Sequence, residues 1–524
     1  MKAWKASTEM NATHIECVLT EAKRMAHADL IDSAENLVSL FLSSSVYNPE
    51  SAATLDTAAL NAVAEIFIVL GDALYAKREY RRAHIAYLQA EQRGKGSLLS
   101  AFKKPTSSSL ASEQDATIRT KQAKCQCSLK DNTGALKTLE SIPVRYRDLA
   151  AHSMLGDCYA ELNLTNNAIQ SYKEAVLLSP LCIELIEKLI DLGVEMKELQ
   201  GLLQDADGRP AVGACMSSGW LQNIVQSLYF KKSTEYRKAF TMYRDLNNMF
   251  PRNLYLLAHT ADCSNALVHE DNTLQVYRHM HKLDKYFANS MDDFAFLLYQ
   301  KEAAEMELCI LASSLVDGAP HLPQTWVTAA YYCAFKKDYE NALSYIDKAI
   351  LLNPRHFNAY LARGHVFWIQ QGGYDMALIA YSQAHSITKK MSSFSGLIET
   401  NIMIGKYKEA ANLSRDCIKL FPKSPLCFYL MGKVLSKSPT AINESIKAFA
   451  KALKFQPCYA AAALSLAEAW LGQNKVTEAI DCLQQILQKV NTGPLRLCLA
   501  KVRCYPYDFL VCVSLFKCAF VVIK

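Results

Sequence analysis

A repeat with a period of about 34 residues runs along most of this 524-residue chain and limits its possible folds more than any other feature. Small residues mark the period, because Ala342 and Ala377 lie 35 positions apart and Ala377 and Ala410 lie 33 apart. A fixed period of this length is typical of stacked helix pairs, since one pair cannot bury its apolar face alone. The sequence therefore predicts an array of helical hairpins.

The clearest copy spans residues 149–182 and contains MLGDCYAELNLTNNAIQSYKEAVLLSP. Gly156 and Ala168 are expected where the two paired helices approach closely, because a larger side chain would force them apart. The stiff ring of Tyr172 is expected to fill the remaining space. Pro180 cannot continue a helix and so ends the unit.

Equivalent positions recur along the chain. A degenerate unit is expected at residues 183–219, because Ala168 and Ala239 lie 71 positions apart, and residues 289–320 are weakly patterned but helical. Gly 19 and Pro 15 are few for this length, which also favours helices over a turn-rich β fold. We therefore predict an all-α tetratricopeptide-repeat superhelical solenoid of about eleven to thirteen helix-turn-helix units. The remaining small and turn-forming positions of the repeat are Gly71, Ala83, Ala342, Pro354, Gly364, Ala377, Ala410 and Ala479.

The pattern divides the chain into five regions. Residues 1–60 hold divergent N-terminal helices, residues 61–93 the first strong unit, and residues 94–115 a Ser-rich insertion that we expect to be flexible. Residues 116–490 form the superhelix. Residues 491–524 lose the repeat and form an atypical hydrophobic tail, which is either an aberrant or alternative C-terminus or a segment that docks on a partner.

Composition and charge exclude several classes of protein. The net charge of +6 is small and no basic stripe is present, so we expect no nucleic-acid partner. The apolar run 509–523 is too short to span a bilayer, and residues 1–19 lack the apolar core of a signal peptide, so we expect an intracellular protein with no membrane partner. The 17 cysteines lack zinc-site spacing, which predicts structural thiols, no metal and no cofactor.

Motifs that carry catalysis are missing from the sequence. Residues 94–97 read GKGS, but the spacing of a phosphate-binding loop is absent. His279 and His281 lie two positions apart, so on a helix they point to different faces and cannot share a metal ion. We therefore predict no catalytic residues and a protein that is not an enzyme.

A helical solenoid does offer a long concave surface lined by the first helix of each unit, which suits a peptide or a helix of another chain. Two neighbouring units carry the candidate partner contacts, among which Tyr331 and Trp368 could anchor a partner or could simply pack the interior. The candidate groove residues are Gln324, Val327, Tyr331, Asn358, Leu361, His365 and Trp368.

Three segments carry a resemblance to a known family: LGDALYAKREYRRAHIAYLQA, HSMLGDCYAELNLTNNAIQSYKEAVLLSP and WVTAAYYCAFKKDYENALSYIDKAILLNP. With the Ser-rich insertion after the first strong repeat, the chain resembles the subunit 7 family of the anaphase-promoting complex, or cyclosome. The resemblance covers residues 30–490 in order. It departs at residues 1–12 and after residue 490, where the last unit and acidic tail of the family are replaced.

The resemblance implies a non-catalytic scaffold in a cullin–RING-type ubiquitin ligase that acts on cell-cycle proteins in mitosis. It also implies a homodimer formed through the N-terminal half, with residues 1–60 involved, and stacking on other tetratricopeptide subunits of the complex. The expected location is the nucleus and cytoplasm, with spindle association in mitosis. The alternative is a peptide-binding adaptor or co-chaperone, which would clamp a carboxylate with a Lys/Asn/Arg cluster and run as a monomer.

Overall fold

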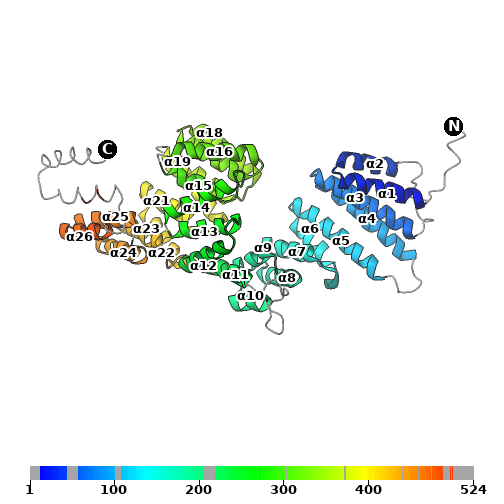
Figure 1. The fold of residues 1–524 in the computed structure, drawn as a ribbon, viewed down its shortest axis with the longest axis horizontal. Helices are drawn as coiled ribbons and strands as arrows, with labels where there is room; N and C mark the ends of the chain where they lie inside the picture. The colour runs from blue at the N-terminus through cyan, green and yellow to red at the C-terminus, as the bar shows by residue number, and fades with distance from the viewer. Residues whose placement is uncertain are drawn as a thin grey trace. The chain divides into compact units, whose positions relative to one another are not determined.

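The structure, a computed structural model, describes residues 12–43, 57–100, 108–203 and 219–487, with short gaps at 268, 302–303, 371–372, 439–440, 458 and 474, together with 496 and 499. These residues form twenty-six α-helices and, within the same ranges, no β-strand (Figure 1). The all-α class is confirmed, and the thirteen consecutive helix pairs lie at the upper end of the predicted number. The chain divides into unit 1 (Met1–Val225) and unit 2 (Gln226–Lys524).

Unit 1 is built from consecutive antiparallel helices, each packed on the next from α3 to α9, with α1 and α2 packed on α3. A short 3₁₀ turn, η2 (Val144–Tyr146), joins α6 to α7, and α11 crosses the boundary between the units. The helices are α1 (Ala12–His27), α2 (Ile31–Ser43), α3 (Thr57–Ala76), α4 (Tyr80–Ser100), α5 (Ser108–Ser128), α6 (Asn132–Glu140), α7 (Leu149–Glu161), α8 (Thr165–Leu178), α9 (Ile183–Asp191), α10 (Met196–Leu202) and α11 (Trp220–Lys232).

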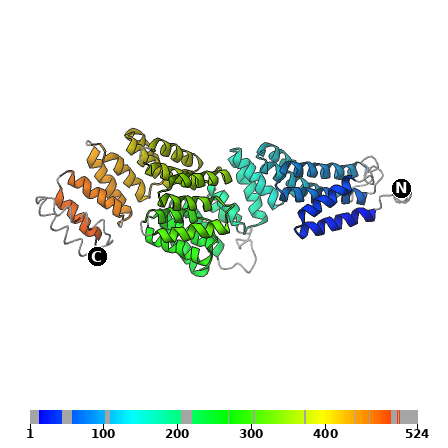
Figure 2. The same cartoon turned by 90° about the horizontal axis from the view of Figure 1, so that it is seen from above.

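Unit 2 continues in the same way, with each helix from α12 to α26 packed on the next. Figure 2 shows the helices of each unit as rows of antiparallel pairs. The helices are α12 (Tyr236–Met249), α13 (Leu254–Ala266), α14 (Glu270–Leu283), α15 (Met291–Tyr299), α16 (Glu305–Gly318), α17 (Pro323–Phe335), α18 (Tyr339–Leu352), α19 (Phe357–Ile369), α20 (Tyr374–Ile387), α21 (Met391–Ile404), α22 (Tyr407–Leu420), α23 (Pro425–Leu435), α24 (Ile442–Phe455), α25 (Ala460–Leu471) and α26 (Val476–Leu487).

The small residues of the repeat lie where the helices of a pair touch. An aromatic ring of the second helix covers the glycine of the first, as Tyr87 covers Gly71 and Tyr172 covers Gly156. A Cβ atom added to Gly156 would overlap the Tyr172 ring, so only a hydrogen atom fits there. The alanines of the second helices have no exposed surface at all: Ala83, Ala168, Ala239, Ala342, Ala377, Ala410 and Ala479.

The other repeat positions have equally simple surroundings. Gly364 meets the ring of Tyr381 in the same way as the two glycines of unit 1. Pro180 and Pro354 stand in the turns that follow α8 and α18, where a helix has ended and no backbone donor is required.

A polar clamp holds two of these aromatic rings. The Tyr172 hydroxyl donates to Oδ1 of Asp157, the residue after Gly156, at 2.6 Å. Lys188 of the next pair then reaches the same carboxylate at 2.9 Å and lies 5.7 Å from the centre of the Tyr172 ring. The same arrangement occurs in α3 and α4, where Tyr87 donates to Asp72 at 2.6 Å. The ring is thus fixed at its tip as well as along its faces.

The turn inside many hairpins contains one residue in the left-handed backbone region. Asp29, Arg78, Lys130, Asn163, Thr234 and Lys337 have φ between 60° and 64°, and Gly193 and Gly405 take the same place with φ of 90°. Most of these residues are not glycine, and a side chain disfavours the left-handed region. The packing of the two helices therefore holds each turn in a backbone conformation that its residue does not favour.

The predicted insertion 94–115 is largely helical, because α4 continues to Ser100 and α5 begins at Ser108. Residues 101–107 lie outside the described residues, so the expectation of flexibility applies to them untested. The degenerate unit contains α9 and α10, and residues 204–218 lie outside the description. The same is true of the tail 491–524, apart from Arg496 and Leu499, and of residues 44–56. None of the helices in the described part of the chain has the length and apolar character needed to cross a bilayer.

Candidate partner-binding surfaces

The first helices of consecutive pairs line one face of unit 2. In this unit α15 packs on α17, α17 on α19, α19 on α21, and α21 on α23, in addition to the contacts within each pair. Helices that touch every second neighbour in this way form the inner side of a curved array. The seven candidate groove residues all belong to α17 and α19, on this inner row.

The structure separates these seven residues by exposure. Val327 has no exposed surface and Leu361 is 4% exposed, so both pack in the core and offer nothing to a partner in this structure. Tyr331 is also buried, at 2% exposure. Gln324, Asn358 and His365 are partly buried, and Trp368 is the most exposed of the set. Partner contact by the accessible members stays a prediction.

Tyr331 and His365 meet, and they do so within a larger group of rings. The Tyr331 hydroxyl and Nδ1 of His365 lie 3.0 Å apart. Phe296 of α15 stacks on His365 with the ring centres 4.4 Å apart and the planes 8° from parallel. Tyr299 and Tyr381 pack at the two ends of this group. Burial lowers the pKa of His365 to about 3, so this imidazole is neutral and acts as an aromatic surface.

Trp368 lies apart from this group. Its nearest aromatic neighbour is Tyr374, whose ring centre is 6.4 Å away in a T-shaped arrangement. Arg363, on the same helix, forms an ion pair with Asp347 of α18. The Arg363 side chain is therefore paired with another residue of this chain.

A pair of carboxylates lies beside the ring group, at the start of α15. Asn358 donates to Oδ2 of Asp292 at 2.9 Å and to Oδ1 of Asp293 at 3.2 Å, so one amide joins both side chains. Nε2 of His356 lies 3.0 Å from Oδ2 of Asp292, which is 3% exposed. Two carboxylates of α15 are thus held in one network with Asn358 of α19 and His356, the residue before that helix.

The two carboxylates differ in their acidity. Burial, followed by the charge of Asp292, raises the pKa of Asp293 to about 8. Burial acts in the same direction on Asp292, but His356 and Asn358 outweigh it and hold the pKa of Asp292 below its ordinary value. The pair therefore carries one firm negative charge, and Asp293 is a partly buried acid that can gain or lose a proton near neutral pH.

Sequence reasoning missed Asp292, Asp293, Phe296 and His356. The available signal was the dipeptide at 292–293 at the start of the apolar helix MDDFAFLLY, where two acids on one short helix need a partner. This face carries flat rings, an amide and carboxylates. Among the described residues no group of three or more His, Cys, Asp or Glu side chains is arranged to hold a metal ion.

A second contact in unit 2 joins segments that lie far apart in the sequence. Lys423, between α22 and α23, donates to Glu235 at 2.6 Å, and Arg237 of α12 donates to the carbonyl of Phe455 at the end of α24. Lys238, followed by Lys423, lowers the pKa of Glu235 to about 2. We call Glu235, Arg237, Lys423 and the Phe455 carbonyl the closing contact, because it connects one end of the α12–α24 arc to the other.

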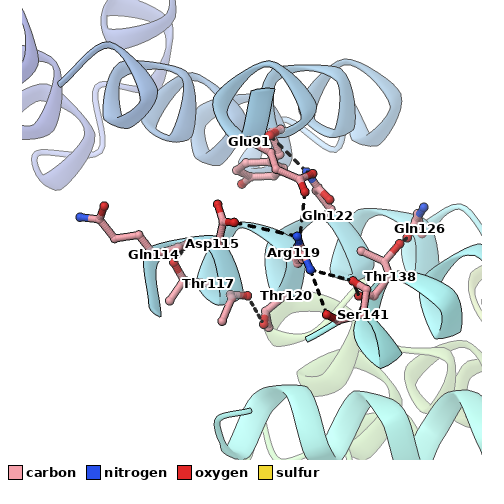
Figure 3. Close-up of polar contacts among 12 residues, drawn as sticks. Glu91, Gln114, Asp115, Thr117, Arg119, Thr120, Gln122, Gln126, Thr138 and Ser141 are labelled. Atoms are coloured by element: carbon pink, nitrogen blue, oxygen red, sulfur yellow. Dashed lines mark hydrogen bonds and ion pairs between the residues drawn. The ribbon is translucent and has the colours of Figure 1, made fainter. Parts of the chain in front are cut away.

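In unit 1 a polar network centred on Arg119 fixes the pairs around the predicted insertion (Figure 3). Arg119 of α5 donates from Nε to Glu91 of α4 at 3.2 Å and from Nη1 to the carbonyl of Ser141, after α6, at 2.9 Å. Gln122 donates to the other oxygen of Glu91 at 3.0 Å. One guanidinium group therefore joins α4 and α5, the helices on either side of residues 101–107, to the end of α6.

Comparison with known proteins gives a consistent result. Models described as tetratricopeptide repeat match residues 149–180, 323–356 and 442–494. The anaphase-promoting complex subunit 7 of Arabidopsis thaliana is 28% identical over 488 residues, covering 90% of this chain and 85% of that protein. The human protein of the same name is 24% identical over 507 residues, covering 95% and 86%.

A solved structure extends the similarity to the fold. The crystal structure of the APC/C hetero-tetramer Cut9–Hcn1 contains a chain that matches with a TM-score of 0.60 and 18% identity, covering 96% of this chain and 92% of that one. A subunit 7 protein of Dictyostelium discoideum is 25% identical over 445 residues, covering 81% of this chain and 75% of that protein. Repeat models, near-full-length similarity and a shared fold agree: this chain has the tetratricopeptide-repeat fold and is similar over most of its length to subunit 7 proteins of the anaphase-promoting complex.

Proposed function

We propose that this chain is a non-catalytic scaffold subunit of the anaphase-promoting complex, in which rows of helical hairpins hold other subunits in position. The observation that carries the proposal is similarity to subunit 7 proteins over 81–95% of the chain. Other tetratricopeptide subunits of the complex are the expected partners, since subunits 6 and 8 of Arabidopsis thaliana are also similar to this chain.

Affinity purification from mitotic cells tests this assignment. The tagged chain should recover the cullin and RING subunits of the complex together with the other tetratricopeptide subunits. Recovery of the chain without the cullin and RING subunits would refute the assignment. Gly201→Ala is a suitable control variant, because a Cβ atom at Gly201 meets nothing within 4 Å.

The non-catalytic part of the proposal has its own test. The inner face of unit 2 carries recognition groups, and Cys127 and Cys158 lie with their sulfur atoms only 3.6 Å apart inside the helix pairs of unit 1. We expect the purified chain to accept no ubiquitin from a charged conjugating enzyme. A thioester on any cysteine of the chain would contradict this expectation.

A homodimer through the N-terminal half is the second part of the proposal. Leu30, between α1 and α2, and Leu40 of α2 are 55% and 69% exposed, which is apolar surface that a second copy could cover. Leu40→Lys should convert the dimer to a monomer in light scattering. Leu351→Lys in α18 changes a leucine that is 82% exposed in unit 2 and should leave the dimer intact. A parent chain that is monomeric at micromolar concentration would contradict the dimer.

We further propose a nuclear and cytoplasmic location with spindle association in mitosis, which a fluorescent fusion tests directly. The peptide-binding adaptor remains the alternative. Its carboxylate clamp would need basic groups on the inner face, whereas α15 places Asp292 and Asp293 there, beside the ring of Phe296. These acids would repel a carboxylate ligand, so the face favours the scaffold function.

A further inference from the structure

Three sulfur atoms from three helices meet in unit 2. Cys417 lies in the last turn of α22, Cys427 in the first turn of α23, and Met391 is the first residue of α21. The two Sγ atoms are 3.0 Å apart, and Sδ of Met391 lies 3.7 Å from Sγ of Cys417 and 3.8 Å from Sγ of Cys427. We call these residues the sulfur cluster.

We propose that the sulfur cluster is a binding site for a soft monovalent metal ion, Cu(I), held by the two thiolates and the thioether. Thiolate and thioether ligands select Cu(I) over harder ions, which prefer imidazole and carboxylate ligands. This site does not appear among groups made of His, Cys, Asp and Glu side chains, because its third donor is a methionine.

The distances fit three-coordinate binding. An ion bonded to three sulfurs at about 2.3 Å in one plane separates them by about 4.0 Å. The distances from Sδ of Met391 to the two cysteine Sγ atoms already approach this value, at 3.7 and 3.8 Å. The distance between Sγ of Cys417 and Sγ of Cys427 must increase by about 1 Å, which side-chain rotation can supply.

The surroundings favour the reduced ion. Cys417 and Cys427 have no exposed surface, and they lie in an apolar cluster with Phe394, Ile398 and Leu430. An apolar shell keeps water away from the metal and supports a low coordination number. Met391 is only partly buried, so an ion can enter past its thioether.

Two helix termini offset the charge of the thiolates. Each coordinated thiol releases a proton to solvent, so a site with two thiolates and one Cu(I) carries one net negative charge. Cys427 lies in the first turn of α23, and Met391 begins α21, where free backbone N–H groups and the helix dipole favour negative charge. The C-terminal end of α22, at Cys417, disfavours negative charge. Two helix N-termini that favour the thiolates are therefore opposed by one helix C-terminus.

Competition for Cu(I) tests the proposal. The full chain, kept reduced and anaerobic, is titrated with Cu(I) against a chromogenic Cu(I) chelator. We compare the parent with Cys417→Ser/Cys427→Ser and with the control Cys127→Ser/Cys158→Ser, which removes a thiol pair 3.6 Å apart in unit 1. The chain contains 17 cysteines, so the difference between variants is the readout. The sulfur-cluster variant should bind one fewer Cu(I) than the parent, and the control variant should retain that ion.

Met391→Leu is the second variant, because leucine keeps the apolar volume and removes only the thioether. It should weaken Cu(I) binding at least 10-fold, and X-ray absorption at one Cu(I) per chain should show three sulfur neighbours in the parent and two in this variant. Circular dichroism checks that each variant is folded, and Met391→Leu decides the question if the serine variant is not.

Three results would overturn the proposal. The first is equal Cu(I) affinity in the parent and Met391→Leu. The second is equal stoichiometry in the parent and a folded Cys417→Ser/Cys427→Ser variant. The third is a Cys417–Cys427 disulfide in peptide mass spectra of the copper-treated protein, without bound copper.

Discussion

Replacement of Gly156 by alanine separates packing from helix propensity. In an exposed helical position the change from glycine to alanine stabilises a helix by about 0.8–1.0 kcal/mol. At Gly156 the new Cβ atom would lie 2.7 Å from Cζ of Tyr172 and closer still to Cε1. Tyr172 cannot move aside easily, because it is 2% exposed and its hydroxyl is bonded to Asp157.

The expected net effect follows from these two contributions. Overpacking of a well-filled core costs about 1–3 kcal/mol. After the gain from propensity is subtracted, Gly156→Ala should destabilise unit 1 by up to about 2 kcal/mol, which corresponds to a fall in Tm of up to about 8 °C for a unit of this size. Gly156→Leu adds three more carbon atoms at the same place and should cost more.

Gly201→Ala is the matched control, since Gly201 lies in α10 and its added Cβ atom meets nothing within 4 Å. It should raise the stability of unit 1, as propensity alone predicts. Both variants are measured by calorimetry and by urea unfolding followed with circular dichroism. The double variant Gly156→Ala/Tyr172→Leu should recover part of the loss, because the ring that is overlapped is removed. An increase in Tm for Gly156→Ala similar to that of Gly201→Ala would refute the packing argument.

Three further predictions concern polar groups. Burial raises the pKa of Asp293 from its ordinary value of 3.8 to about 8. The stability that protonated Asp293 contributes to the fold is therefore fully present below pH 3.8, and it is lost as the pH rises to about 8. Asp293→Asn should therefore gain stability relative to the parent between pH 4 and 8, by at most about 1.4 kcal/mol per pH unit in urea unfolding, and parallel pH profiles would contradict this. Glu235→Gln should weaken the closing contact and speed amide hydrogen exchange at residues 420–425, with an unchanged exchange pattern as the contrary result. Arg119→Ala should lower stability by about 1–3 kcal/mol in thermal unfolding. Arg119→Lys should recover little of this loss, because one ammonium group cannot reach both Glu91 and the Ser141 carbonyl. Full recovery by lysine would show that charge alone matters.

The repeat was predictable from the sequence because it rests on side-chain volume. Gly156 and Ala168 leave room for a partner helix whatever surrounds them, and such a requirement is visible in a single chain. The turn conformation was not visible, since Arg78, Asn163 and Lys337 occupy left-handed positions that glycine usually marks. The helical ends of the insertion were missed because serine and lysine are poor guides to structure when a neighbouring helix supplies the packing.

The inner face was only partly predictable for a similar reason. Tyr331 and His365 share a register position in neighbouring units, so the repeat alone brings them together. Asp292 lies in the weakly patterned segment 289–320, 64 positions before His356, and the contact between the two residues depends on how α15 and α19 stack. Contacts of this kind arise from the curvature of the array, which no single period encodes.

Stability in a repeat array is usually described as a sum of terms for each unit and for each pair of neighbours. The clamp around Tyr172 gives the neighbour term a physical basis, because Asp157 belongs to the same pair and Lys188 comes from the next one. Damage at Gly156 should therefore reach the adjacent pair and fade beyond it. Unit 2 adds a contact that the nearest-neighbour description lacks, since Lys423 and Glu235 are 188 positions apart. A contact of this length makes the two ends of the α12–α24 arc depend on each other, so this arc should unfold more cooperatively than the same number of pairs joined only in sequence.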